Sequence, residues 1–206
     1  MSTRATSTAA KAARREQILQ AAAELFDRLG YEQASASLIA ERATLAKGSL
    51  YTYFPSREAI FISLYERALD DWLVEMERRV IDSAQQLDDP LLQLVGELVD
   101  SLARAPRLGP LASLLRPVLE RGLDRPALLA ARQRQEARLR QAALVLSDRR
   151  RVADSEAAQQ ALSRFLGLLV SARHVVAGSS ESLPDEQAVL EELENTAYRL
   201  FSVSQG

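Results

Sequence analysis

Cysteine is absent from the 206-residue chain, and histidine occurs once, at His174. Without cysteine there is no disulfide, no thiolate metal site and no cysteine nucleophile. A single histidine excludes a histidine cluster for a metal, and the sequence has no glycine-rich phosphate loop. We therefore expect no catalytic residues, no metal site, no cofactor and no enzymatic activity.

Long apolar runs are also lacking. No stretch of about 18 apolar residues occurs, which excludes a membrane-spanning helix. The first residues, MSTRATSTAAKAARR, have no apolar segment of the kind that a secretory signal needs. We expect a cytoplasmic protein that has no membrane partner.

Residues that favour strands are few. Val, Ile and Thr together number 23, against 33 Ala and 34 Leu, so the composition favours helices. Apolar spacing, prolines and capping residues predict an all-α fold of about nine helices. A disordered tail is expected over 1–11, and short bent helical segments over 104–126, which hold 4 of the 7 prolines. The other predicted helices cover 12–29, 36–43, 47–54, 57–82, 88–102, 127–147, 154–177 and 182–201.

Charge is unevenly distributed along the chain. The net charge is −2, which argues against a uniformly basic nucleic-acid binder. Residues 1–57, however, hold 8 Lys and Arg against 5 Asp and Glu, whereas the remaining 149 residues hold 18 against 23. The sequence therefore has a mildly basic head and an acidic body.

The segment 35–54 predicts two helices of about two turns each, separated by three or four residues. Such helices are too short to be stable alone, so they must pack on their neighbours, as in a helix-turn-helix. The second short helix is expected to begin near Lys47. It would present a lysine, hydroxyl groups and an aromatic ring to solvent, with a glycine that permits close approach, which suits the edge of a DNA groove.

The same segment resembles the DNA-binding domain of TetR-type transcriptional repressors over about residues 14–62. The resemblance is carried by Gly30-Tyr31, Ile39-Ala40, Ala43, Lys47-Gly48-Ser49-Leu50-Tyr51, Tyr53-Phe54 and Ser56-Arg57-Glu58. It implies a helix-turn-helix DNA-binding domain at 12–56, followed at 57–206 by a larger helical domain for effector binding and dimerisation. It also implies a homodimeric regulator, most simply a repressor, that binds a palindromic operator in double-stranded DNA and is released by a small-molecule effector.

The resemblance assigns DNA contacts to individual residues. Ser35 caps the first short helix and contacts a phosphate, while Lys47 and Ser49 face base edges with Gly48 beside them. Thr52 lies on the groove side, and Arg57 clamps a phosphate. The two tyrosines, Tyr51 and Tyr53, contact the DNA backbone from either side of the second helix. Lys11, Arg14 and Arg15 extend the phosphate contacts.

Four residues depart from the family pattern. Ala34 stands where the family usually has threonine, and Leu38 stands where it has an acidic or polar residue, but Thr44 and Ala46 matter more. Thr44 stands where glycine normally allows the turn, and Ala46 stands where a serine or threonine normally caps the second helix. A β-branched residue at positive φ is costly, and a lost cap costs about 1 kcal/mol. Either the turn takes another conformation in this chain, or the unit is less rigid before DNA arrives.

The body is expected to supply an effector pocket and a dimer interface. Expected pocket residues are Trp72, Met76, Leu98, Leu102, Arg104, Leu111, Leu115, Arg116 and Phe165. For the interface, the last two helices offer wide apolar faces that suit a four-helix bundle, through Ala161, Phe165, Leu169, Ala172, Val176, Leu193, Ala197 and Leu200. The alternative function is a helical protein–protein interaction module with weak or non-specific DNA binding, which the departures at Thr44 and Ala46 leave open.

Overall fold

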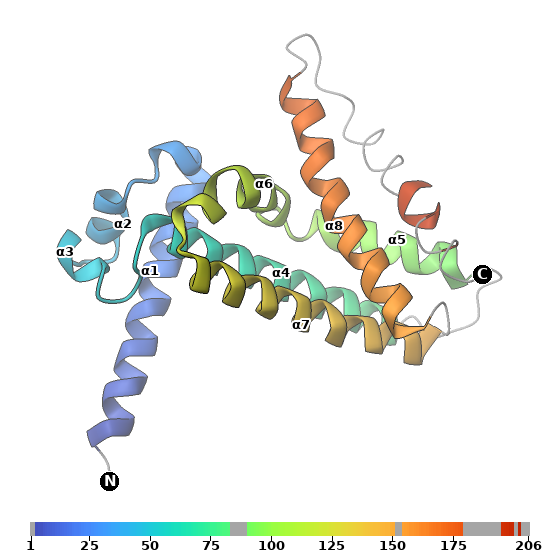
Figure 1. The fold of residues 1–206 in the computed structure, drawn as a ribbon, viewed down its shortest axis with the longest axis horizontal. Coiled ribbons are helices and arrows are strands. Elements are labelled where there is room, and N and C mark those ends of the chain that lie inside the picture. Colours follow the sequence, from blue (N-terminus) through green and yellow to red (C-terminus); the bar gives the residue numbers. More distant parts are fainter. Residues whose placement is uncertain (1–2, 83–89, 151–153, 179–194, 200–201, 203–206) are drawn as a thin grey trace. The chain divides into compact units, whose positions relative to one another are not determined.

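The structure is a computed structural model that describes residues 3–82, 90–150, 154–178, 195–199 and 202. All regular structure in these ranges is helical (Figure 1), which confirms the predicted all-α class. The elements are α1 (Thr3–Gln33), α2 (Ala36–Arg42), α3 (Lys47–Leu50), α4 (Arg57–Asp82), α5 (Pro90–Ala103), α6 (Leu108–Leu114), a π-helix η1 (Leu115–Leu119), a 3₁₀ turn η2 (Glu120–Gly122), α7 (Arg125–Arg150) and α8 (Ser155–Gly178). Residues 195–199 are also helical.

The chain divides into two compact units. The first comprises Met1–Glu66 and Leu115–Leu128, and the second comprises Arg67–Leu114 and Leu129–Gly206. The helix α4 runs through both units, and the bent segment η1–η2 belongs with the helix-turn-helix. The predicted boundary between 12–56 and 57–206 therefore stays a prediction, and it differs from this division.

The core of the first unit joins α1, the two short helices and the start of α4. Phe26 of α1 and Tyr31 both pack on Phe61 of α4, with ring centroids 5.9 and 4.9 Å away. Leu50 of α3 and Ile39 of α2 are fully buried. The short helices are thus stabilised by tertiary packing, as their length requires.

Helix α1 begins further toward the N-terminus than predicted. It starts at Thr3 rather than at 12, so residues of the expected tail are helical, in line with the high helix propensity of the alanines at 9, 10, 12 and 13. The helix is interrupted at Gly30, which has φ 74° and ψ 175°. This conformation is essentially restricted to glycine and differs from the αL conformation, whose ψ is about 47°, so Gly30 interrupts the helix without being an αL cap.

The second unit is built around Trp72 of α4. Its ring stacks on Phe165 of α8 at 6.0 Å, and its indole Nε1 donates a 2.7 Å hydrogen bond to the hydroxyl of Ser101 in α5. That hydroxyl donates in turn to the carbonyl of Leu98 at 2.7 Å. The buried indole N–H therefore has a partner, as a buried donor requires. Across the unit, the guanidinium of Arg138 in α7 binds two carboxylates of α4, those of Asp70 and Glu77.

The long helix over 57–82 is confirmed, and its N-cap Ser56 accepts a hydrogen bond from the amide of Ala59 at 3.1 Å. The bent character of 104–126 is confirmed by α6, η1 and η2. The predicted helix over 182–201 lies largely outside the described residues. Within the described part of the chain, no helix is long and apolar enough to cross a membrane.

Candidate nucleic-acid interface

Helix α2 begins at a capped terminus, as predicted. The hydroxyl of Ser35 accepts a hydrogen bond from the amide of Leu38 at 3.3 Å, which satisfies one of the orphan donors of the first turn. Ser35 is half-buried. A phosphate contact by the same hydroxyl stays a prediction.

The turn between α2 and α3 keeps the left-handed conformation although it lacks glycine. Thr44 has φ 56° and is the only non-glycine residue of the described chain with positive φ. Its amide donates to the carbonyl of Glu41 at 3.0 Å, and the amide of Leu45 donates to that of Ala40 at 2.8 Å. This pair of bonds is a Schellman motif with threonine at the position that glycine favours. Of the two alternatives, a different turn conformation is therefore excluded, and the strain is retained at Thr44.

Helix α3 begins at Lys47, where the sequence placed it. Its N-cap is Ala46, which makes no side-chain capping bond. The helix ends at Leu50 and continues as a turn over 51–53, so it is shorter than the predicted 47–54. The missing cap is consistent with a helix of only one turn, because no side chain at the N-terminus satisfies the orphan amides.

The surface of α3 and the following turn carries most of the predicted DNA contacts. Leu50 and Phe54 are buried in the core. Tyr53 is half-buried. The exposed residues are Lys47, Gly48, Ser49, Tyr51 and Thr52. A cation, two hydroxyls and a phenol of this segment are thus exposed to solvent and can donate to phosphates and to base edges.

Arg15 of α1 holds the loop that follows α3. Its guanidinium lies 4.0 Å from the centre of the Phe54 ring, and its Nη1 donates to the carbonyl of Tyr53. The sequence predicted a phosphate contact for Arg15 and missed this internal role, because the contact spans 38 residues. The loop that carries Tyr53 is thereby attached to α1.

Arg57 is also engaged within the protein. Its guanidinium lies 4.0 Å from the centre of the Tyr31 ring, and its Nη1 donates to the carbonyl of Tyr31 at 3.5 Å. The phenol of Tyr31 donates to Glu58 at 3.2 Å. Burial raises the pKa of Tyr31, and the neighbouring Arg57 opposes the shift. The phosphate contact predicted for Arg57 stays a prediction beside this packing role.

The turn η2 meets the start of α4 within the first unit. The hydroxyl of Ser56 donates to the carbonyl of Gly122 at 3.4 Å. A Cβ placed on Gly122 would lie 2.3 Å from Cγ of Glu58, so only glycine permits this approach. The contact joins residues 64 positions apart, and no local sequence pattern marks it.

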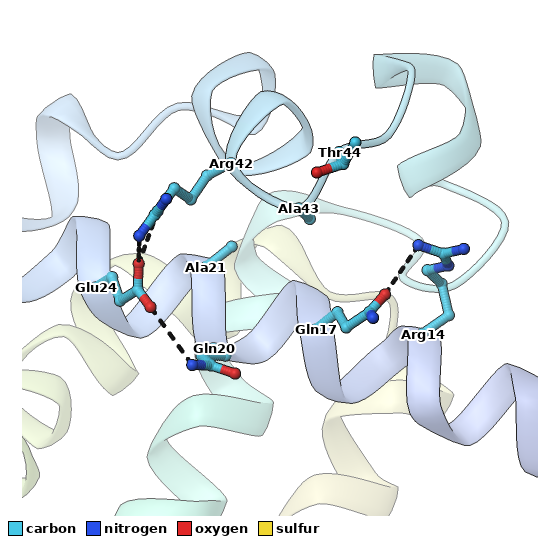
Figure 2. A pocket seen from close by; sticks show the side chains of 8 residues that line it. All are labelled: Arg14, Gln17, Gln20, Ala21, Glu24, Arg42, Ala43 and Thr44. Carbon is cyan, nitrogen blue, oxygen red and sulfur yellow. Dashed lines mark hydrogen bonds and ion pairs between the residues drawn. The ribbon is translucent and has the colours of Figure 1, made fainter.

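A hollow of about 400 Å³ lies between α1, the end of α2 and the turn that follows (Figure 2). Arg14 donates to Gln17 at 2.8 Å at one end of it, and Arg42 donates to Glu24 at 2.7 Å at the other. Its lining is Arg14, Gln17, Gln20, Ala21, Glu24, Arg42, Ala43 and Thr44. Arg14, Ala43 and Thr44 stand out in the sequence for other reasons, but no local pattern indicates the hollow, since the proximity of its residues depends on how α2 packs on α1.

The residues predicted for an effector pocket are divided between core and surface. Trp72, Met76, Leu98, Leu111 and Phe165 are fully buried in the second unit. Leu102 is half-buried and Arg104 is exposed. Leu115 is half-buried and Arg116 exposed, and both belong to the first unit. An effector role for this set stays a prediction.

The residues predicted for a dimer interface are only partly described. Ala161, Phe165 and Ala197 are buried within the chain. Leu193 and Leu200 lie outside the described residues, as do the side chains of Leu169, Ala172 and Val176. The interface therefore also stays a prediction.

An all-helical chain with a capped α2, a Schellman turn and an exposed α3 defines a helix-turn-helix protein with a helical body. Residues 18–64 match the family described as "Bacterial regulatory proteins, tetR family". Over residues 18–64 the chain therefore matches TetR-family transcriptional regulators, which confirms the resemblance carried by these residues.

Individual relatives are similar over the same region. The chain is 37% identical over 68 residues to the fatty acid metabolism regulator protein of Bacillus subtilis, covering 33% of this chain and 35% of that protein. It is 37% identical over 68 residues to the HTH-type transcriptional regulator RutR of Escherichia coli K12, covering 33% and 32%. The aligned part thus spans about a third of the length of these relatives.

The fold as a whole is similar to solved structures. The structure of Thermus thermophilus FadR, described as a TetR-family transcriptional repressor in complex with lauroyl-CoA, matches with a TM-score of 0.62 at 21% identity. The match covers 91% of this chain and 92% of that one. At this identity the likeness establishes the fold.

Proposed function

We propose that the protein is a homodimeric repressor that binds a palindromic operator through α3 and is released by a small-molecule effector. The residues proposed to contact DNA are Ser35, Lys47, Gly48, Ser49, Tyr51, Thr52, Tyr53 and Arg57, with Lys11, Arg14 and Arg15 adding backbone contacts. Such a regulator acts in the cytoplasm, where the chromosome is accessible.

The observation that supports this proposal is that α3 exposes polar side chains while one of its residues is anchored in the core. Lys47, Ser49 and Tyr51 are exposed, while Leu50 between them is fully buried. A single buried anchor with donors on the outside is what a helix needs to enter a major groove and contact both base edges and phosphates. The basic head and acidic body support the same orientation, because the acidic body is repelled by phosphates.

Dimerisation and effector binding rest on separate support. One helix-turn-helix gives weak specificity, whereas two related by a two-fold axis bind half-sites about 34–36 Å apart. The FadR structure from Thermus thermophilus holds lauroyl-CoA, which supports an effector in the helical body of this chain as well. An effector that favours a different half-site separation would lower the affinity for the operator.

A gel shift tests the DNA-binding proposal. The full chain is titrated into the DNA that flanks its own gene, at low salt. Wild type should shift a specific fragment, and Lys47→Ala with Tyr51→Ala should abolish the shift while native mass spectrometry still detects a dimer. Arg28→Ala, at an exposed position of α1, is the control. Absence of any shift by excess wild-type protein would overturn the proposal in favour of a protein–protein interaction module.

Native mass spectrometry tests the effector as well. The protein is measured as purified, and a co-purified small molecule should appear as a mass increment that disappears on denaturation. The operator complex should weaken when that molecule is added back. A bound molecule that leaves operator affinity unchanged contradicts the effector mechanism.

A further inference from the structure

The hollow between α1 and the α2–α3 turn is rich in hydrogen-bond donors. Both oxygens of its only carboxylate are engaged, because Glu24 accepts from Arg42 and from Gln20, the latter at 3.5 Å. Arg14 makes one hydrogen bond, with Gln17, and a guanidinium has five donors. Charged donors therefore remain available at the Arg14 end of the hollow.

Neutral donors complete this end. The amide nitrogen of Gln17 and the hydroxyl of Thr44 have no hydrogen-bond partner among the described residues. Figure 2 places Arg14 and Gln17 on α1 below the turn that carries Thr44. The lining holds two arginines and one glutamate, so its charge is positive, and the surplus lies where Arg14 has no acidic partner among the lining residues.

We propose that this hollow binds a small anion of the phosphate or carboxylate class, held by Arg14, Gln17 and Thr44. The volume of about 400 Å³ lies in the range of small-molecule sites. The lining on α1 extends from Arg14 to Glu24, which is about 15 Å along a helix, long enough for an anionic group and a polar remainder. Charge-assisted hydrogen bonds from a guanidinium are the strongest that such a group can accept here.

An anion bound in the hollow affects DNA binding by the helix-turn-helix, a step that rests on the proposed function. Thr44 belongs to the turn that directs α3, and Arg14 is one of the proposed phosphate contacts. An anion in the hollow neutralises the charge that DNA phosphates need, so anion and operator oppose each other, and by linkage the effect is reciprocal. The hollow is thus a second regulatory site, located in the first unit, which carries the helix-turn-helix.

Inorganic pyrophosphate is the probe for the anion site. Its binding to the full chain is measured by calorimetry and by ³¹P NMR without DNA. Arg14→Gln should weaken binding about tenfold or more, the range expected for a charge-assisted pair, and Thr44→Val, which keeps the β-branched shape, should weaken it several-fold. Arg28→Gln, an exposed arginine of the same helix outside the hollow, should bind as wild type does. Failure of wild type to bind, or equal binding by Arg14→Gln, overturns the proposal.

A second measurement separates a free anion from the phosphates of DNA. Operator affinity is measured with and without pyrophosphate at one ionic strength, matched with sodium chloride. Pyrophosphate should lower the affinity of wild type and Arg28→Gln several-fold and leave Arg14→Gln unaffected. If Arg14→Gln weakens DNA binding but the free chain binds no pyrophosphate, the hollow is only a DNA-backbone contact and the proposal is overturned. If pyrophosphate binds through Arg14 and no DNA binds at all, the anion site is supported and the repressor function is the part that fails.

Discussion

The guanidinium of Arg15 lies 4.0 Å from the centre of the Phe54 ring, and its Nη1 donates to the carbonyl of Tyr53. One side chain of α1 thereby holds both the ring that anchors the α3–α4 loop and the backbone of that loop. Because Tyr51 and Tyr53 belong to this loop, their position depends on Arg15.

Replacing Arg15 should therefore destabilise the first unit, which carries the helix-turn-helix. Arg15→Ala loses a cation–π contact of about 1 kcal/mol and a hydrogen bond of about 1 kcal/mol, so we expect about 2 kcal/mol less free energy of unfolding. Arg15→Lys retains the charge without the planar fork and should lie between. Urea unfolding measures both, with exposed Arg28→Ala as control. An equal loss for Arg28→Ala would show that the effect is general charge removal.

Replacing Thr44 should change the free energy of unfolding in the opposite direction. A β-branched residue at φ 56° carries about 1–2 kcal/mol of strain, and glycine relieves it at an entropic cost of about 0.5–1 kcal/mol. Thr44→Gly should raise the free energy of unfolding by between about 0 and 1.5 kcal/mol, and Thr44→Asn should do nearly as well because asparagine tolerates this conformation. Thermal and urea unfolding give the values. A loss of stability on Thr44→Gly would mean that the threonine side chain contributes more than its backbone costs.

The turn at Thr44 also marks how far sequence reasoning reaches. The positions of the short helices followed from local spacing and from the family pattern. The conformation of the turn did not, because a threonine in place of glycine is compatible with either a new turn or a strained one. The contacts of Arg15 and of Gly122 join segments distant in sequence. The periodicity of a sequence does not indicate which distant segment a residue will contact.

The missing cap of α3 gives a third prediction. Ala46 occupies the N-cap position without a side-chain hydrogen bond, so Ala46→Ser should satisfy one orphan amide and add about 0.5–1 kcal/mol to the free energy of unfolding. Ser35→Ala, at the capped end of α2, is the matched reverse experiment and should cost about 1 kcal/mol. Urea unfolding of both variants checks the pair. If Ala46→Ser leaves stability unchanged, the amides of α3 are already satisfied by water.

Alkaline pH should destabilise the first unit through its buried tyrosines. Burial raises the pKa of Tyr65, with further contributions from Glu66 and Glu120, and burial likewise raises that of Tyr31. Above pH 10 the unfolded tyrosines lose protons that the folded ones keep. The unfolded state then binds fewer protons, and stability falls as pH rises, by at most about 1.4 kcal/mol per pH unit and per tyrosine. The stability is fully present below pH 10.

Unfolding measured between pH 9 and 12 tests this dependence. Tyr65→Phe removes one ionisable group and should make the slope of stability against pH shallower. Tyr51→Phe, at an exposed position, is the matched control. A slope for Tyr65→Phe identical to that of wild type assigns the alkaline loss to other groups.

The approach of Gly122 to α4 gives the last prediction. A methyl group on residue 122 would meet Cγ of Glu58 at 2.3 Å and its Cβ at 2.7 Å, so Gly122→Ala must displace Glu58 and break its hydrogen bond with Tyr31. Overpacking of this kind costs about 1–3 kcal/mol. Glu58→Ala removes the clash with Cγ and Cδ but leaves Cβ, so Gly122→Ala should cost less, but not nothing, in that background. A double-mutant cycle by urea unfolding should give a coupling of at least about 0.5 kcal/mol. Additive effects would mean that η2 moves away as a whole, and that Glu58 does not depend on the glycine for its position.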